Sequence, residues 1–98
     1  DGPALAGQLW DLADWAGEAD DLRDRMALLV EPLEAGDRGS LRDGFVLSAA
    51  VLRHFQLDPL LPGELLPRDW PGDPLRKDYD RYDDAYRRVL GDWLRGHG

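Results

Sequence analysis

The sequence contains no cysteine, no isoleucine and no threonine, and valine occurs only at positions 30, 46, 51 and 89. Without cysteine, the chain has no disulfide framework, no thiolate metal site and no cysteine nucleophile, which suits the reducing cytoplasm. The shortage of β-branched residues, which favour strands, argues against a sheet. Leucine, alanine, arginine and acidic residues dominate instead. The composition therefore predicts an all-α protein.

Long apolar runs are also missing. No stretch approaches the roughly 20 apolar residues that span a bilayer, and the first ten residues, DGPALAGQLW, lack the basic start and apolar centre of a signal peptide. We therefore expect no membrane association. Ninety-eight residues suffice for one domain with its own core. Because the chain begins with aspartate rather than methionine, we expect it to be a piece excised from a longer protein.

Basic residues are fewer than acidic ones. The chain carries 20 acidic and 12 basic residues, a formal net charge of −8, which should repel nucleic acid and anionic membranes. Eleven of the twelve basic residues are arginine, a side chain suited to bidentate contacts with carboxylates or phosphates. Ordinary ion pairing at the surface explains most of them equally well.

Apolar residues at steps of three and four predict a first helix that starts with Asp11 as N-cap and ends around Pro32 and the segment 34–40. Its stripe comprises Leu12, Ala16, Ala19, Leu22, Met26, Leu29 and Leu33, with Trp15 beside it. Trp10 would point away from this stripe. We therefore expect Trp10 in an extended segment before the helix, or in contact with something outside it, as an interface candidate.

A second helix is predicted to open at Ser40, which forms a capping box with Asp43, and to stop before Asp58 because Pro59 follows. Its predicted buried stripe is Leu41, Phe45, Ala49, Leu52 and Phe55.

Five of the seven prolines lie between positions 59 and 74. This stretch predicts a stiff connector with a short helical turn at 63–66, followed by a type II turn with Pro71 and Gly72 at its centre. Asp73 and Pro74 then open a third helix that ends near Gly96. Its predicted stripe is Leu75, Tyr79, Tyr82, Tyr86, Val89 or Leu90, and Trp93. On its exposed face, Asp83 is predicted to pair with Arg87 and Asp84 with Arg88.

Catalytic and metal-binding patterns are absent. No serine lies in a G-x-S-x-G motif, and the aspartate runs match neither an EF-hand nor a Glu-x-x-His site, so we predict no catalytic residue, no metal and no cofactor. Arg53 and His54, together with Arg68, are candidates for a phosphate or carboxylate contact beside the connector. The alternative for Arg53 and His54 is a favourable interaction with the negative end of the helix dipole.

The segment DPLLPGELLPRDWPG, residues 58–72, resembles the signature D-P-x-L-P-x-E-L-L-P-x-D-W-P-G of the C-terminal domain of the PaaX family. The matching residues are Asp58, Pro59, Leu61, Pro62, Glu64, Leu65, Leu66, Pro67, Asp69, Trp70, Pro71 and Gly72. LWDL at residues 9–12 also resembles the start of that domain.

This resemblance implies a transcriptional repressor of phenylacetic acid degradation. Such a repressor has a winged-helix domain that binds DNA, a ferredoxin-like middle domain and this helical domain, and an aryl-CoA effector, phenylacetyl-CoA, releases it from DNA. Residues 1–98 would then be the C-terminal domain, touching DNA only through the missing N-terminal domain.

Two functions follow from this reading. In the first, the domain senses the effector, and Trp70 is a ligand-binding candidate together with Arg53, His54 and Arg68. In the second, the domain has no ligand site and serves as a structural module that docks on the middle domain or forms a homodimer, with Trp10 and the connector as apolar contacts.

Overall fold

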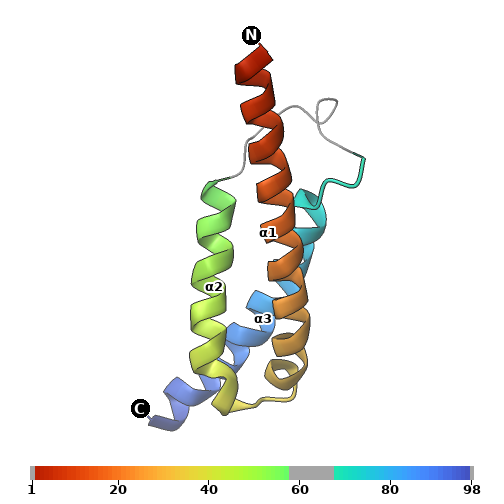
Figure 1. Cartoon of the computed structure of the whole chain (residues 1–98). Coiled ribbons are helices and arrows are strands. Elements are labelled where there is room, and N and C mark those ends of the chain that lie inside the picture. The colour runs from red at the N-terminus through yellow and green to blue at the C-terminus, as the bar shows by residue number, and fades with distance from the viewer. Residues whose placement is uncertain (1, 58–67, 98) are drawn as a thin grey trace.

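The computed structural model describes residues 2–57 and 68–97, with the side chains of residues 12–57 and 68–96. These residues form α1 (Gly2–Glu34), a 3-10 turn η1 (Arg38–Ser40), α2 (Leu41–Gln56) and α3 (Gly72–His97), as Figure 1 shows. The described ranges contain no strand, and the all-α prediction is confirmed. The helical turn predicted at 63–66 lies outside the described residues.

Helix α1 begins earlier than predicted, at Gly2 rather than at Asp11, so Trp10 lies within the helix and the expected extended segment is wrong. The residues before Asp11 are mainly good helix formers, and Pro3 stands in the first turn, where its missing N–H has no helical partner to lose. The side chain of Trp10 lies outside the described side chains, so its role as an interface candidate stays a prediction.

The carboxyl end of α1 is closed by a glycine. Gly36 has φ +83°, its N–H donates to the carbonyl of Leu33 at 3.0 Å, and the N–H of Asp37 donates to the carbonyl of Pro32 at 3.0 Å. This pair of bonds is a Schellman motif, and it satisfies carbonyls that the helix end leaves free. The predicted end of the helix near Pro32 is confirmed.

The predicted capping box at Ser40 is wrong. Ser40 is the N-cap residue of α2, but its side chain makes no cap hydrogen bond there. Its hydroxyl instead donates to Asp37 Oδ2 at 2.9 Å, while Asp37 Oδ1 accepts the N–H of Gly39 at 2.9 Å. Asp37 therefore caps η1 and also orients Ser40, because the chain makes a tight turn before α2 begins.

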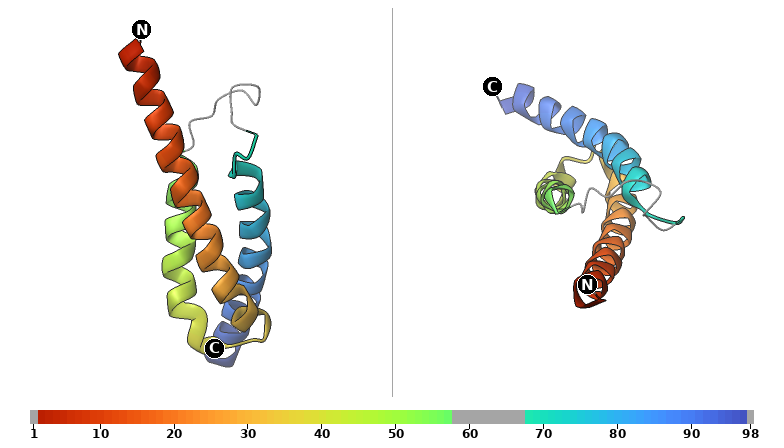
Figure 2. Two further views of the ribbon diagram at one scale, coloured as in Figure 1. Left: turned by 45° about the vertical axis from the view of Figure 1, so that its right-hand side comes forward. Right: turned by 90° about the horizontal axis from the view of Figure 1, so that it is seen from above.

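Helices α1 and α3 lie alongside each other and α2 packs against both, in an elongated body of 58 × 20 × 19 Å. Figure 2 shows the N-terminal end of α1 projecting beyond the other two helices. The buried stripe of α1 is close to the predicted one; it comprises Leu12, Trp15, Ala19, Leu22, Met26, Val30 and Leu33. Helix α3 adds Leu75, Tyr82, Ala85 and Val89 to the same core.

Among the described side chains, two ion pairs join α1 to α3. Arg23 Nε lies 2.6 Å from Asp78 Oδ2, and Arg81 contacts both carboxylate oxygens of Glu34 at 2.7 and 3.0 Å. The hydrogen bond from Arg81 lowers the pKa of Glu34, and the hydrogen bond to Asp78 raises the pKa of Arg23. Both pairs are partly exposed, so each contributes little to stability but favours one register of the two helices.

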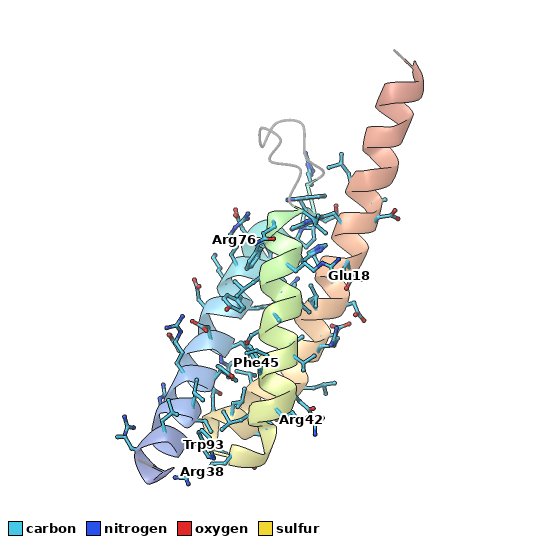
Figure 3. All side chains as sticks on the ribbon, turned by 90° about the vertical axis from the view of Figure 1, so that its left-hand side faces the viewer. Glu18, Arg38, Arg42, Phe45, Arg76 and Trp93 are labelled. Atoms are coloured by element: carbon cyan, nitrogen blue, oxygen red, sulfur yellow. The ribbon has the colours of Figure 1, made fainter. Side chains whose placement is uncertain are left out.

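The buried face of α2 differs in part from the predicted one: Leu41 and Phe55 pack against the core as predicted, but the centre of the stripe does not. Gly44, Leu47, Val51 and His54 face the core, whereas the side chains of Phe45 and Leu52 are 65% and 48% exposed. Figure 3 shows Phe45 on the outside of the bundle. Both sets recur at helical steps, and the less apolar set is buried because Gly44 admits the tyrosines of α3 and His54 meets Trp15.

Helix α3 starts one residue before the predicted cap. The N–H of Leu75 donates to the carbonyl of Pro71 at 2.8 Å, so Gly72 is already helical and Asp73 lies in the first turn. Among the described glycines only Gly36 has positive φ, so the predicted type II turn at Pro71 and Gly72 is wrong. The predicted pair of Asp83 with Arg87 is confirmed, at 2.7 Å, whereas the predicted pair of Asp84 with Arg88, both of them described, does not form.

Candidate functional site

Three aromatic rings from separate parts of the chain stack where the connector reaches α3. The ring of Trp15 in α1 lies 4.4 Å from the ring of His54 in α2, with 20° between the planes. It lies 4.9 Å from the ring of Trp70, which precedes α3, with 14° between the planes. Trp15 is common to both contacts. We call these three residues the aromatic stack.

Reciprocal hydrogen bonds fix Trp15 against His54. The indole Nε1 of Trp15 donates to the carbonyl of His54 at 3.0 Å, and His54 Nε2 lies 2.9 Å from the carbonyl of Trp15. A carbonyl oxygen only accepts, so His54 Nε2 carries a hydrogen and donates it. The His54 side chain is buried, and its Nε2 is engaged within the fold. This pair of bonds fastens α1 to α2.

Trp70 lies on Gly72. A Cβ atom at position 72 would stand 2.8 Å from Trp70 Nε1, closer than real Cβ contacts, and 3.1 Å from its Cδ1. Both residues belong to the signature segment, and glycine at position 72 lets the indole fold back over the first turn of α3. Trp70 is half-buried and packs against the core. The signature residues from Asp58 to Pro67 lie outside the described residues.

A pocket of about 190 Å³ opens beside the exposed part of Trp70. Its lining comprises Leu12, Ala13, Ala16 and Asp20 from α1, and Asp69, Trp70 and Pro71 from the start of α3. Most of these side chains are apolar, and the two carboxylates are its charged groups. The pocket therefore suits a flat apolar group better than an anion.

The structure brings together only two of the four predicted ligand-binding residues. His54 and Trp70 meet through Trp15, whereas Arg53 and Arg68 are exposed to solvent. Sequence reasoning treated Trp15 as packing beside the stripe of the first helix. Nothing in its local sequence pointed to His54, because the two residues are 39 positions apart.

Tyrosines form a second polar cluster, between α2 and α3. Tyr82 is fully buried, and its hydroxyl donates to the carbonyl of Gly44 at 2.5 Å while accepting from Ser48 Oγ at 3.5 Å. Burial raises the pKa of Tyr82 and that of Tyr79. Tyr79, Tyr82 and Tyr86 belong to the core or pack against it, as predicted, whereas Trp93 remains 38% exposed.

The described residues contain neither a cluster of metal ligands nor a membrane-spanning helix. Within residues 2–57 and 68–97, no three histidine, aspartate or glutamate side chains converge as ligands for a metal ion. None of the helices in these ranges combines the length and apolar character needed to cross a membrane.

Comparison with known proteins identifies the family. The sequence matches the family described as PaaX-like protein C-terminal domain over residues 10–95. The chain belongs to this family. No curated protein and no solved structure matches it. The PaaX-like domain is a domain of regulators rather than of enzymes, and the match confirms the resemblance inferred from the signature segment.

Proposed function

We propose that this PaaX-like domain is the effector-sensing part of a transcriptional repressor and that its effector is an aryl-CoA such as phenylacetyl-CoA. The observation that carries the proposal is the position of Trp70. This signature residue is at once a member of the aromatic stack and a wall of the apolar pocket beside α1. A ligand at Trp70 would therefore act directly on the contact that joins the connector to α1.

The size and chemistry of the pocket support an aryl group. A cavity of about 150 Å³ in a protein interior accommodates benzene, so a pocket of about 190 Å³ holds one aromatic ring but not a whole coenzyme. An aromatic ring would lie against Trp70 and the small side chains of Ala13 and Ala16. The carboxylates of Asp20 and Asp69 at the pocket keep phosphates outside it.

Arginines supply phosphate contacts outside the pocket in this proposal. Arg68 is two residues from Trp70 in the sequence, Arg53 adjoins His54, and both are exposed. The coenzyme A part of a bound aryl-CoA would extend from the pocket into solvent, where guanidinium groups can bind its phosphates. His54 then has an indirect role, because it holds Trp15 and through it the wall formed by Trp70.

The regulatory step follows from linkage. An effector releases a repressor from DNA only if it binds more tightly to the conformation that fits the operator poorly. Here the differential contact would be the stack of Trp70 on Trp15, which couples the connector to α1 and, through His54, to α2. Contact with DNA would belong to the N-terminal domain of the full protein, with the middle domain between them, and such a repressor acts in the cytoplasm.

Calorimetric titration with phenylacetyl-CoA, free coenzyme A and phenylacetate tests this proposal. We expect phenylacetyl-CoA to bind and each fragment to bind more weakly. Trp70→Phe should weaken the binding of phenylacetyl-CoA, and Arg68→Gln should weaken it without changing the response to phenylacetate. Arg88→Gln, an exposed arginine on α3, is the matched control for Arg68. Absence of heat and of a thermal shift at about 1 mM phenylacetyl-CoA would rule out a site within this domain alone.

A second candidate function is that of a docking module without a ligand. The observation in its favour is the outer side of α2, where Phe45, Val46 and Leu52 are 65%, 57% and 48% exposed. The docking partner would be the middle domain of the same protein or a second copy of the chain. Light scattering over a range of concentrations distinguishes a homodimer from a monomer that awaits another partner.

A further inference from the structure

The outer face of α2 combines exposed apolar side chains with positive charge. We define the α2 outer face as Arg42, Phe45, Val46, Ala49, Leu52 and Arg53, all of which are exposed. Three of these are large apolar residues, more than an isolated surface leucine would explain. The face points away from the core residues Gly44 and Val51. Among the residues that the structure describes, none covers this side of α2.

The arginines of this face are not engaged by carboxylates within the fold. Arg23, Arg81, Arg87 and Arg95 each have a carboxylate partner. Among the residues that the structure describes, Arg25, Arg68 and Arg88 have none, and the same holds for the two arginines of this face, Arg42 and Arg53. They are eleven residues apart, which places them on nearly the same side of the helix and about 16 Å apart along it. The chain as a whole carries a net charge of −8. This basic face therefore stands out against an acidic molecule.

We propose that the α2 outer face binds an acidic amphipathic helix of a partner protein. The apolar side chains of that helix would pack between Phe45, Ala49 and Leu52, and carboxylates three turns apart would meet Arg42 and Arg53. Small Ala49 at the centre lets a second helix approach closely. Charge complementarity of this kind fixes register and excludes partners of the wrong sign.

The charges also argue against a second copy of this chain as the occupant. Consider two antiparallel copies of α2 related by a two-fold axis, with Phe45 of one copy against Leu52 of the other. In this arrangement Arg42 of one copy lies within one helical turn of Arg53 of the other. This antiparallel arrangement collects four arginines on one flank of the interface, which is destabilising. A parallel pair puts the arginines of the two copies on opposite flanks, where the α2 outer face of the other copy offers no carboxylate. A partner that supplies carboxylates to Arg42 and Arg53 meets opposite charge at this face.

Binding of a synthetic helix tests the inference. The probe is a labelled amphipathic peptide with leucines at steps of three and four and glutamates on its flanks; the comparison peptide has lysine in place of glutamate. In fluorescence anisotropy titrations of the whole chain, we expect the acidic peptide to bind, the basic peptide not to bind, and salt to weaken the complex. Reversing both charges, with Arg42→Glu and Arg53→Glu, should weaken binding at least roughly tenfold.

Controls separate this face from the rest of the molecule. Arg88→Glu reverses an exposed charge on α3 and should leave the acidic peptide bound. Leu52→Ala should weaken binding without unfolding the domain, because Leu52 lies outside the buried core. Equal binding of both peptides, no binding of the acidic one up to about 1 mM, or a dimer of the chain that Leu52→Ala dissociates would each overturn the inference. Arg53 is shared with the phosphate contact of the proposed aryl-CoA site, whereas Arg42 is not, and both lie outside the Trp70 pocket. Arg42→Glu alone should weaken binding of the acidic peptide and leave the response to phenylacetyl-CoA unchanged, which separates the two proposals.

Discussion

At the scale of single residues, the hydroxyl of Tyr82 stands out because it is the polar end of a fully buried side chain in the core. It donates to the carbonyl of Gly44 and accepts from Ser48, so all three groups are satisfied within the fold. The ionised form of Tyr82 would lose the hydrogen that Gly44 accepts and would be a charge among apolar groups. This is why burial raises its pKa.

We predict that Tyr82 makes the domain sensitive to alkali. The pKa of Tyr82 in the folded state lies above its unfolded value, so the stabilisation is complete below about pH 10 and decreases as pH rises beyond it. Tyr82→Phe should lower the free energy of unfolding by about 0.5–1.5 kcal/mol at neutral pH, because the short hydrogen bond to Gly44 is lost together with the long one from Ser48. The stability of the Tyr82→Phe variant should also decrease less steeply above about pH 10 than that of the original chain. Urea unfolding at several pH values measures both; an unchanged alkaline slope would contradict the prediction.

The aromatic stack shows what sequence can and cannot predict about a site. His54 and Trp70 were singled out from the sequence, the first by its place near a helix end and the second by the signature segment. Trp15 was not, because its partner lies 39 positions away and only the packing of α1 on α2 brings the two together. A local pattern identifies unusual residues, but the contact between them depends on tertiary structure.

At the scale of elements, α2 carries two overlapping stripes at helical spacing, and the structure buries the less apolar one. Hydrophobicity favoured the stripe with Phe45 and Leu52, yet the core side holds Gly44 and His54. Neither a glycine nor a histidine signals burial by itself. Both are buried because of their tertiary contacts: Gly44 makes room for two tyrosines, and His54 forms a hydrogen bond with Trp15. Helix α3 was easier to predict because it has a single apolar stripe.

Close packing between α2 and α3 at Gly44 leads to a second prediction. A Cβ atom at this position would lie 2.9 Å from Tyr86 Cδ1 and 3.2 Å from the Tyr82 hydroxyl. Gly44→Ala should gain about 1 kcal/mol from helix propensity but lose more through overpacking, with a net loss of about 1–2 kcal/mol. Thermal or urea unfolding measures the difference. A net gain in stability would show that α2 and α3 do not approach so closely.

Gly17 provides the matched control for that experiment. It lies within α1, and a Cβ atom there would meet nothing within 4 Å. Gly17→Ala should therefore raise the free energy of unfolding by about 1 kcal/mol through helix propensity alone. If Gly44→Ala lowers the free energy of unfolding and Gly17→Ala raises it, the difference separates tertiary crowding at Gly44 from the intrinsic cost of glycine in a helix.

At the scale of the whole molecule, the two long helices α1 and α3 pack together as a frame, and α2 packs against both. Helices α1 and α3 share most of the apolar core and also the ion pairs of Arg23 with Asp78 and of Glu34 with Arg81. Helix α2 is fastened to that frame at two places, through the pair of His54 with Trp15 and through the contact of Gly44 with Tyr82. Because α2 keeps one side for the core, its other side remains available for binding.

The ion pair of Glu34 with Arg81 gives the last prediction, which concerns how the frame responds to acid. Arg81 lowers the pKa of Glu34 in the folded state, so the pair stabilises the domain above about pH 4.5 and the contribution is lost as pH falls through the lowered value. Glu34→Gln should reduce stability slightly at neutral pH and make the loss of stability in acid less steep.

Salt and a second glutamate complete that test. Both side chains are partly exposed, so raised ionic strength should shrink the difference between Glu34→Gln and the original chain. Glu18→Gln removes an exposed carboxylate of α1 that has no ion-pair partner among the described residues, and it should leave the acid profile nearly unchanged. If the two variants respond alike to pH and salt, the change reflects the net charge of −8 rather than the contact between α1 and α3.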